Sequence, residues 1–364
     1  MRKKIHVAVV FNEPTVETAA GRKFISEMGE IEPAVTHSQV VSGHQPSSVD
    51  LSEIGVLAER EHVQDALQEK GYKTSLFNMN SDIKRLIQFI EEKEPDIIFN
   101  LCESVGDEST HEMFVAGIYE LMRVPYTGAG AFALGMCQNK ARTKQALSFH
   151  KIRVPRFALY KDANEVNADD FDLKFPVIVK PSHEDASVGI DNGSVVDSIA
   201  GVRKRVRYIF QNYDQPAIVD EYIEGRELNV AIMGNRRPIV LPISEIDFSG
   251  LPEDYPRIVT YNAKWMEGTQ EYKGTVGICP AQIPAEVERQ AKEIALRCYR
   301  IMGCRDYARV DMRLDKNNNL HVIEVNPNPD ISDDAGFARS ARAYGLCFDE
   351  IINKIVEYAL ERTP

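Results

Sequence analysis

The chain has 364 residues, of which 43% are hydrophobic and 27% charged, and its formal net charge is −12. This length suits two or three packed lobes, and the composition is that of a globular protein. The negative charge, with no basic run to offset it, argues against nucleic acid and anionic membranes as partners. No stretch is apolar for long enough to span a bilayer. The 6 cysteines show no Cys-x-x-Cys spacing, which favours buried thiols in a reducing cytoplasm over disulfides or a zinc site.

The first third of the sequence alternates predicted strands and helices. Residues 5–11 and 96–101 are apolar runs typical of buried strands. Between them, residues 63–71 have helical spacing, and Ser81 can cap a second helix with apolar residues at i, i+3, i+4 and i+7. This alternation predicts an open parallel sheet. Residues 12–57 interrupt this alternation and show only weak periodicity. Three interpretations of this segment stay open, namely a lid, an oligomer contact or a disordered insert.

After about residue 151 the pattern changes to short strands with few helices between them. This predicts an antiparallel lobe. Helical spacing returns over residues 287–302 and again over residues 351–360. The strand-like segments are residues 175–180, 217–222, 228–233 and 237–243.

A predicted β-hairpin lies between these two helices, with a polar turn at residues 315–319. In the simplest unbulged register, Asp311 faces Glu324. Arg309 then faces Asn326, and all four side chains project from one face. Facing carboxylates repel unless a cation lies between them, and the oxygen ligands of Asp311, Glu324 and Asn326 suit Mg²⁺ or Mn²⁺ rather than zinc. The alternative is an exposed hairpin with scattered charge, although the return strand is largely apolar.

Four further features favour a phosphate-rich ligand. Lys180 ends an apolar strand and needs an anion unless its ammonium reaches solvent. The polar loop at residues 182–189 can close over phosphates through its backbone N–H groups. Acids in residues 220–227 can accept hydrogen bonds from an adenine amine and ribose hydroxyls, or they form a solvated acidic turn. Lys140 lies at a basic helix start, where charge alone specifies no role.

In this order, the motifs resemble those of the D-alanine–D-alanine ligase branch of the ATP-grasp superfamily. The resemblance covers most of residues 55–360, and the ordered set is far more specific than any one motif. It rests on residues 58–61, 124–128, 140, 175–181, 186–189, 221–227, 261–264, 309–311 and 324–327.

The resemblance implies a three-lobed ATP-grasp fold of mixed α/β and α+β class. An open parallel α/β domain would occupy residues 1–135, a central lobe residues 136–235 and a C-terminal lobe residues 236–364. ATP would lie between the last two lobes. The implied contacts are Lys140 and Lys180 with phosphates, Asp220, Glu221 and Ile223 with the adenine region, Glu227 with the ribose, and Asp311, Glu324 and Asn326 with two Mg²⁺ ions.

The chemistry implied by the resemblance is the formation of a peptide or amide bond. The carboxylate of one substrate attacks the γ-phosphate of ATP, giving an acyl phosphate and ADP. An amine of a second substrate then displaces phosphate. Metal ions and lysines would neutralise the charge on the transferred group.

Three residues are candidates for catalysis in such a reaction. Arg309 would stabilise the tetrahedral oxyanion, where losing a donor typically costs about 10²–10³ in rate. Its alternative role is simple charge balance with the hairpin acids. Lys264 would reach the phosphates from residues 247–274, which can close as a lid. Ser187 lies in the loop that follows Lys180.

The sequence departs from the family pattern at positions that would orient the substrates. Ala186 replaces the first of two serines, and Trp265 replaces a tyrosine after the lid lysine. Residues 327–331 and Ala335 replace Thr-Ser-Pro-Gly-Met and a following serine. Because Trp265 removes a hydroxyl and adds bulk, a pocket built for one methyl side chain is disfavoured.

Besides Trp265, two residues are candidates for substrate binding. Glu59 can hold a substrate ammonium, although an acid near a helix start is also favoured by the helix dipole alone. Asp330 lies in the altered segment after the hairpin, where a backbone N–H can assist Arg309.

We therefore expect a cytoplasmic, ATP-dependent carboxylate–amine ligase acting on small molecules such as amino acids. Its expected product is an amide other than D-Ala-D-Ala. Two alternatives stay open, namely a genuine D-alanine–D-alanine ligase of cell-wall synthesis and an ATP-binding protein without turnover. A homodimer is compatible with the sequence. The sequence does not identify either substrate.

Overall fold

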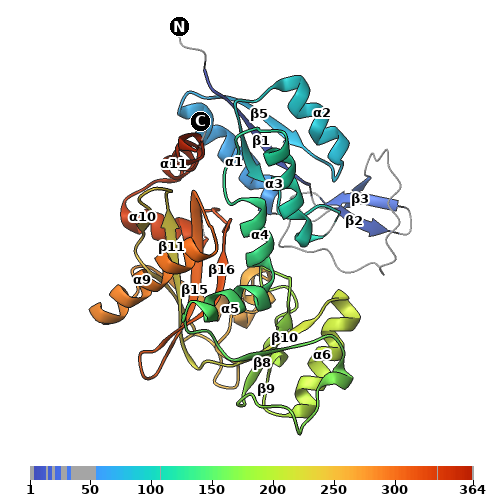
Figure 1. The fold of residues 1–364 in the computed structure, drawn as a ribbon, viewed down its shortest axis with the longest axis vertical. Helices are drawn as coiled ribbons and strands as arrows, with labels where there is room; N and C mark the ends of the chain where they lie inside the picture. Colours follow the sequence, from blue (N-terminus) through green and yellow to red (C-terminus); the bar gives the residue numbers. More distant parts are fainter. Residues whose placement is uncertain are drawn as a thin grey trace. The chain divides into compact units, whose positions relative to one another are not determined.

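The structure is a computed structural model that describes residues 4–13, 15–18, 21–25, 31–33, 55–106, 108–333 and 335–362 (Figure 1). Its tertiary contacts divide the chain into two compact units, residues 1–131 with 347–364 and residues 132–346. Within the described ranges, no helix combines the length and apolar character needed to cross a membrane.

The first unit contains a parallel three-stranded sheet. β1 (His6–Phe11) lies between β5 (Lys73–Asn78) and β6 (Ile97–Leu101) and pairs in parallel with both. Every residue of β1 is buried, as expected from its apolar run. α1 (Gly55–Glu69) packs against β1 and β5, and α11 (Phe348–Glu361) packs against α1 and β6. The predicted open parallel α/β sheet is confirmed.

One helix of this unit begins differently from the prediction. α2 (Ile83–Lys93) is capped by Asp82, whose carboxylate accepts hydrogen bonds from the backbone N–H groups of Lys84 and Arg85. Ser81 instead donates its hydroxyl hydrogen to the Asn12 side chain. A carboxylate also favours the positive end of the helix dipole, so the acid is the better cap.

The remaining elements of the first unit include part of the long predicted insert. β2 (Thr15–Thr18), β3 (Gly21–Ile25) and β4 (Ile31–Pro33) form an antiparallel sheet. Residues 34–54 lie outside the described residues, and the three interpretations of this insert stay open. A short 3₁₀ helix and α3 (Glu112–Leu121) complete the unit.

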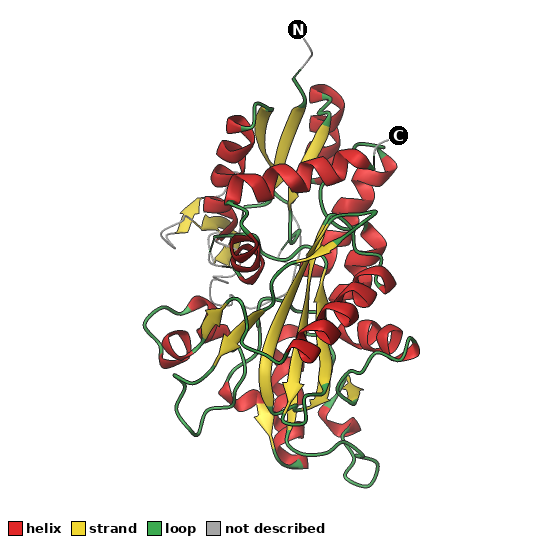
Figure 2. Cartoon of the chain, turned by 90° about the vertical axis from the view of Figure 1, so that its left-hand side faces the viewer, coloured by secondary structure: helices red, strands yellow, loops and turns green. Residues whose placement is uncertain are grey.

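The second unit contains two antiparallel sheets, drawn as yellow strands in Figure 2. In the smaller sheet, α6 (Ile199–Tyr213) packs against β8 and β10 and covers an apolar core. The strands, in spatial order, are β7 (Phe157–Tyr160), β10 (Ala217–Glu221), β8 (Val177–Pro181) and β9 (Val195–Val196).

The larger sheet is covered by α9 (Ala285–Ile301), which packs against β11, β15 and β16. Its antiparallel pairing confirms the predicted lobe type, but the expected strand over residues 237–243 is reduced to β12 (Ile239–Val240). The main strands, in spatial order, are β14 (Val276–Ile278), β13 (Ser244–Asp247), β11 (Gly225–Met233), β15 (Tyr307–Asp315) and β16 (Leu320–Asn326).

Five further helices of the second unit carry or flank the candidate residues. α5 begins at Lys140, with Asn139 as its N-cap. The predicted lid contains two short helices, α7 and α8. The bounds are α4 (Ala131–Gln138), α5 (Lys140–Phe149), α7 (Tyr261–Trp265), α8 (Gln270–Gly274) and α10 (Gly336–Tyr344).

The expected division of the chain at residues 135 and 235 stays a prediction. The contacts group residues 347–364 with the N-terminal unit, whereas the sequence assigns them to the C-terminal lobe. α11 accounts for this grouping because its apolar stripe packs on α1 and β6.

Candidate active site

The hairpin of β15 and β16 brings together the residues predicted for metal binding. Asp311 pairs with Glu324, and Arg309 pairs with Asn326. The Asn326 amide donates to Asp311 Oδ2 over 2.9 Å and lies 3.4 Å from Glu324 Oε1. The four side chains therefore share one face of the hairpin, as predicted.

The predicted unbulged register is nevertheless wrong near the turn. Leu314 pairs with Leu320, and the ladder shifts by one residue before the two acids pair. Leu320, Val322 and Val325 all belong to the apolar core. In a regular strand Glu324 would point to the same face as Val322, because side chains alternate with period two. The bulge lets the apolar residues face the core while Glu324 faces the site.

Asp311 is saturated with hydrogen-bond donors. Its Oδ1 accepts from Asn229 over 2.7 Å and from Arg309 Nε over 2.8 Å. Its Oδ2 accepts from the Arg309 guanidinium over 2.8 Å and from Asn326 over 2.9 Å. A carboxylate offers about four lone-pair sites, so a metal ion must displace one of these donors to bind Asp311. Turning the Asn326 amide over would remove one donor and present an oxygen.

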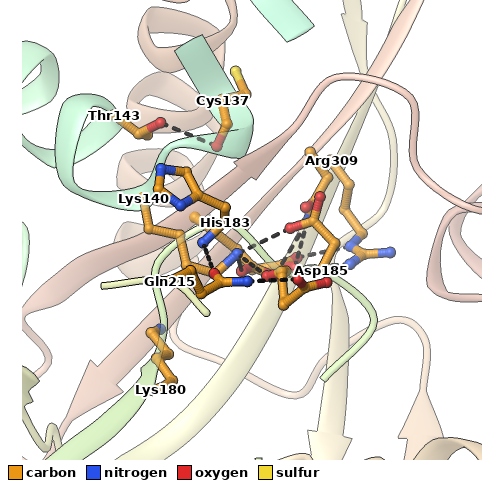
Figure 3. Close-up of polar contacts among 12 residues, drawn as sticks. Cys137, Lys140, Thr143, Lys180, His183, Asp185, Gln215 and Arg309 are labelled. Carbon is orange, nitrogen blue, oxygen red and sulfur yellow. Dashed lines mark hydrogen bonds and ion pairs between the residues drawn. The ribbon is translucent and has the colours of Figure 1, made fainter. Parts of the chain in front are cut away.

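Lys140 contacts the loop at residues 182–189, called the phosphate loop below after its predicted role, and also the hairpin. Figure 3 shows Lys140 with His183 and Asp185 of this loop. The Lys140 ammonium donates to the Glu184 carbonyl over 2.6 Å and to Asp185 over 2.9 Å, and lies 3.7 Å from Glu324. Burial lowers the pKa of Lys140, but the charges of Asp185 and Glu324 outweigh it, and the net shift is upward.

Glu324 is ionised by the cations around it. Burial raises the pKa of this carboxyl, but the charges of Lys140, Lys180 and Lys264 outweigh burial and hold the pKa well below its usual range. Glu324 is therefore a carboxylate at neutral pH, as a metal ligand must be.

Lys180 points into the protein, so the alternative of a solvent-seeking lysine is wrong. It is 7% exposed, and its ammonium lies 3.3 Å from Asp220 Oδ2. The same oxygen lies 3.1 Å from the ammonium of Lys144, which is 1% exposed. Asp220 Oδ1 is buried and has no hydrogen-bond partner among the described residues. An unsatisfied buried acceptor is costly, so this oxygen suits a ligand that brings an N–H donor.

The predicted lid contacts the phosphate loop through Trp265. The indole N–H donates to the Ala186 carbonyl over 3.0 Å. Ala186 and Ser187 both adopt left-handed backbone conformations, with φ of 51° and 63°. Lys264, beside Trp265, is an exposed residue. Desolvation of its ammonium and the charge of Arg309 lower the pKa of Lys264.

The segment predicted to contact adenine and ribose is held by a buried arginine. Arg313 donates to the Ile223 carbonyl and to the Glu227 carboxylate. Glu221 instead accepts from the Lys174 backbone N–H over 3.0 Å and lies 3.6 Å from Arg156. Ile223 and Glu227 are thus brought together, whereas the Glu221 side chain is engaged elsewhere.

Two further residues were predicted to bind substrate, Glu59 and Asp330. Glu59 lies on α1 in the first unit, whereas all other candidates belong to the second. Asp330 is exposed, and its carboxylate accepts hydrogen bonds from the backbone and hydroxyl of Ser332. The roles predicted for both residues stay predictions.

The site contains three further residues that were not predicted from the sequence, namely Lys144, Asn229 and Arg313. Each had a positional signal. Lys144 follows Lys140 at i+4 on one helix face, and Arg313 continues the alternation of Arg309 and Asp311 along one strand face. Asn229 had no such signal, because it reaches Asp311 only through the pairing of β11 with β15.

The arrangement suits a polyanion bound with a divalent cation. Lys140 and Arg309 supply positive charge beside the two hairpin acids, and Lys144 and Lys180 supply it beside Asp220. The described residues contain no group of three His, Cys, Asp or Glu side chains that could hold a metal by themselves. The two acids and the amide therefore offer an incomplete oxygen set that phosphate oxygens or water would complete.

Comparisons with known proteins identify relatives of this chain. A model described as the D-ala D-ala ligase C-terminus matches residues 147–357, more than half of the chain. A D-alanine–D-alanine ligase from Desulforudis audaxviator is 30% identical over 318 residues, covering 85% of this chain and 97% of its own. An uncharacterized protein, y4sG, from Sinorhizobium fredii is 33% identical over 304 residues, covering 82% of this chain and 86% of its own.

A solved structure agrees with the fold. The crystal structure of D-alanine–D-alanine ligase from Bacillus anthracis complexed with ATP matches 98% of each chain with a TM-score of 0.71, at 20% identity. The fold is thus the ATP-grasp fold, mixed in its sheets as predicted. With the family match and the relatives at 30% identity, the chain belongs to the D-alanine–D-alanine ligase-like branch of the ATP-grasp ligases, enzymes that form C–N bonds.

Proposed function

We propose that this ligase uses ATP to join a carboxylate and an amine, both from amino-acid-like substrates, and that its product differs from D-Ala-D-Ala. The observation that carries the nucleotide part is the set formed by Lys140, Lys180 and Asp220. Both ammonium groups are buried, and they lie 2.9 and 3.3 Å from the carboxylates of Asp185 and Asp220. Buried cations of this kind suit a ligand that carries several negative charges. Asp220 Oδ1, which has no hydrogen-bond partner among the described residues, can accept a hydrogen bond from a donor such as an adenine amine.

The reaction begins with attack of a substrate carboxylate on the γ-phosphate. Lys140 and Lys180 neutralise charge on the phosphates, and Lys264 approaches them from the lid. The acyl phosphate that forms has a good leaving group, which a free carboxylate lacks. A second substrate's amine then attacks its carbonyl, and phosphate departs as the amide forms.

Arg309 is placed to stabilise the oxyanion of that second step. Its guanidinium is held by two hydrogen bonds to Asp311, so its orientation is fixed before the substrate arrives. The pKa of Arg309 is raised, because Asp311 and other acids outweigh the effect of burial. A preorganised cation needs no reorientation in the transition state.

The donor chemistry of the hairpin fits Mg²⁺ or Mn²⁺. Asp311, Glu324 and Asn326 would hold the ion, which would supply positive charge to offset that of the phosphates. Glu324 is already ionised. Asp311 must lose one of its four hydrogen-bond donors before it can bind the ion. The roles of all these residues are part of the proposal.

The substrate part of the proposal rests on the altered positions. The Trp265 indole bonds to the Ala186 carbonyl, where the family pattern has a tyrosine and a serine. A bulkier ring at a position that would orient the alanines supports a different substrate. A cytoplasmic location and a homodimer stay predictions.

The test is a screen of amino-acid pairs with Mg-ATP, reading ADP release and the mass of the product. We expect ADP only when both a carboxylate and an amine substrate are present, with a product mass equal to their sum minus water. Lys180→Met should abolish turnover. Lys174→Met, which alters an exposed lysine just before the same strand, should leave it unchanged.

The same screen decides between the alternatives. Selective and rapid formation of D-Ala-D-Ala would identify a genuine D-alanine–D-alanine ligase, a function named for several relatives at about 30% identity. Nucleotide binding without ADP release across the whole panel would instead identify a binding protein without turnover.

A further inference from the structure

Arg313 is a buried arginine at the centre of a hydrogen-bonded cluster. It lies on β15 two residues after Asp311 and is 4% exposed. Its Nε donates to the Ile223 carbonyl over 3.0 Å, and a terminal nitrogen donates to the Gly225 carbonyl over 3.0 Å. The other terminal nitrogen donates to Glu227 over 3.1 Å and to the Arg257 carbonyl over 2.9 Å. Four acceptors from two separate segments thus share one guanidinium.

The first segment links β10 to β11 and carries the candidate adenine and ribose residues. Gly225 has a φ of 148°, and a Cβ there would lie 2.0 Å from the Leu314 carbonyl oxygen. Only glycine lets this backbone lie directly against β15. Arg313 therefore fixes a segment whose path is already tightly constrained.

The guanidinium of Arg313 favours the ionised form of Glu227. Burial raises the pKa of Glu227, while the guanidinium lowers it, and the net shift is upward. A carboxylate in this position can accept two hydrogen bonds from vicinal hydroxyls. Without Arg313 the carboxylate would lose its nearest cation and its fixed orientation.

The second segment is the base of the lid. The Arg257 carbonyl accepts from Arg313 and also from the Tyr222 hydroxyl over 3.3 Å. The Arg257 side chain donates to the carbonyls of Leu251 and Pro252. The lid base and the β10–β11 segment are thus joined through Arg313.

We propose that Arg313 is a positioning residue that orients Glu227 toward the ribose hydroxyls of ATP and couples this contact to the base of the lid. The inference rests on the proposed ATP-dependent function and adds a determinant of nucleotide affinity. The guanidinium fork is suited to this role because it binds several acceptors in one plane, which a lysine does not. Rings of Tyr222 and Phe248 lie 5.6 and 5.7 Å from its central carbon and restrict its movement.

The test compares ATP with 2′,3′-dideoxy-ATP in the wild type, Arg313→Met and Arg313→Lys. In the wild type, loss of the hydroxyls should raise KM for the nucleotide. Arg313→Met should raise KM for ATP about tenfold or more with a smaller change in kcat, because a hydrogen-bonded charged pair is broken. The same variant should show no further penalty with the dideoxy nucleotide.

The matched control is Arg226→Met. Arg226 lies in the same sheet and pairs with Glu245 over 2.5 Å, but it makes no bond to the Glu227 carboxylate. This variant should discriminate between the two nucleotides as the wild type does. Arg313→Lys, which keeps the charge, should show an intermediate KM and serves if the methionine variant does not fold.

Direct titration of the wild type with Mg-ATP separates two kinds of failure. If the wild type binds no ATP, the proposed function itself fails. If the wild type binds ATP and the Arg313 variants retain its full discrimination between the two nucleotides, only the role of Arg313 is overturned. An equal rise in KM for both nucleotides would also overturn it, because general disorder does not depend on the hydroxyls.

Discussion

Lys144 lies one helical turn after Lys140 and is almost fully buried, with 1% of its surface exposed. Burial lowers its pKa to about 8, Asp220 opposes that shift and Lys180 reinforces it. In the unfolded chain the Lys144 ammonium has its ordinary pKa of 10.5 and keeps its proton up to about that pH. Between these values the unfolded state holds more protons, so the contribution of Lys144 to stability becomes more favourable as pH rises through this window.

The same residue predicts a pH dependence of nucleotide affinity. Phosphates near Lys180 would raise the pKa of Lys144, so ATP binding should take up a proton near pH 8. Affinity for Mg-ATP should therefore fall as pH rises above about 8, by at most about tenfold per pH unit for one proton. The measurement is calorimetric titration at pH 7, 8 and 9.

Lys144→Arg is the control for this prediction. A guanidinium stays charged throughout the range, so the step near pH 8 should vanish while affinity at neutral pH is largely kept. An unchanged step in this variant would show that another group titrates.

At the scale of elements, the hairpin shows how far the sequence can be read. Residue types and alternation predicted that Arg309, Asp311, Glu324 and Asn326 would share a face, and the pairing confirms it. The bulge was not predicted, because the simplest register was assumed from the turn outward. The apolar residues of β16 contained the signal, since Val322 and Val325 are three apart and cannot both face the core in a regular strand.

Contacts between distant segments were harder to predict. Asn229 lies 82 residues from Asp311 in sequence, and its role depends on which strands become neighbours. The segment that Arg313 holds is 90 residues away at Ile223. No local spacing encodes such pairings, and only the order of the strands in the sheet brings them together.

The lid yields a prediction at the same scale. α7 is attached to the phosphate loop by the hydrogen bond from Trp265 to the Ala186 carbonyl. Trp265→Phe keeps an aromatic ring, although a smaller one, and removes the donor, whose hydrogen bond contributes about 0.5–1.5 kcal/mol. Amides of α7 should then exchange with solvent up to about tenfold faster, and kcat should fall, because a looser lid admits water and leaves Lys264 less well placed.

Hydrogen exchange read by mass spectrometry checks this expectation peptide by peptide. Tyr272→Phe is the matched control, since Tyr272 is a partly exposed aromatic residue on the neighbouring lid helix. Its exchange pattern in α7 should equal that of the wild type. Equal protection of α7 in Trp265→Phe and the wild type would refute the attachment.

At the scale of the whole molecule, the candidate residues are distributed unevenly. Every residue proposed for nucleotide and metal binding belongs to residues 132–346, whereas Glu59 belongs to the other unit. The resemblance predicted the family and fold of the whole chain. It did not predict that the last helix packs with the first unit, because a stripe of apolar residues does not identify its partner.

This distribution predicts where ligands protect the chain. A ligand that binds only the folded state at 100 times its Kd stabilises that state by about 2.7 kcal/mol. Mg-ATP alone should therefore slow amide exchange in the second unit, most strongly in β8, β10 and β15, and leave the parallel sheet of the first unit unchanged. Adding an amino-acid substrate should then protect α1 around Glu59, because the ammonium group of the substrate is expected to bind the Glu59 carboxylate. Glu59→Gln should abolish only this second effect, and protection of both units by nucleotide alone would show that they open as one cooperative body.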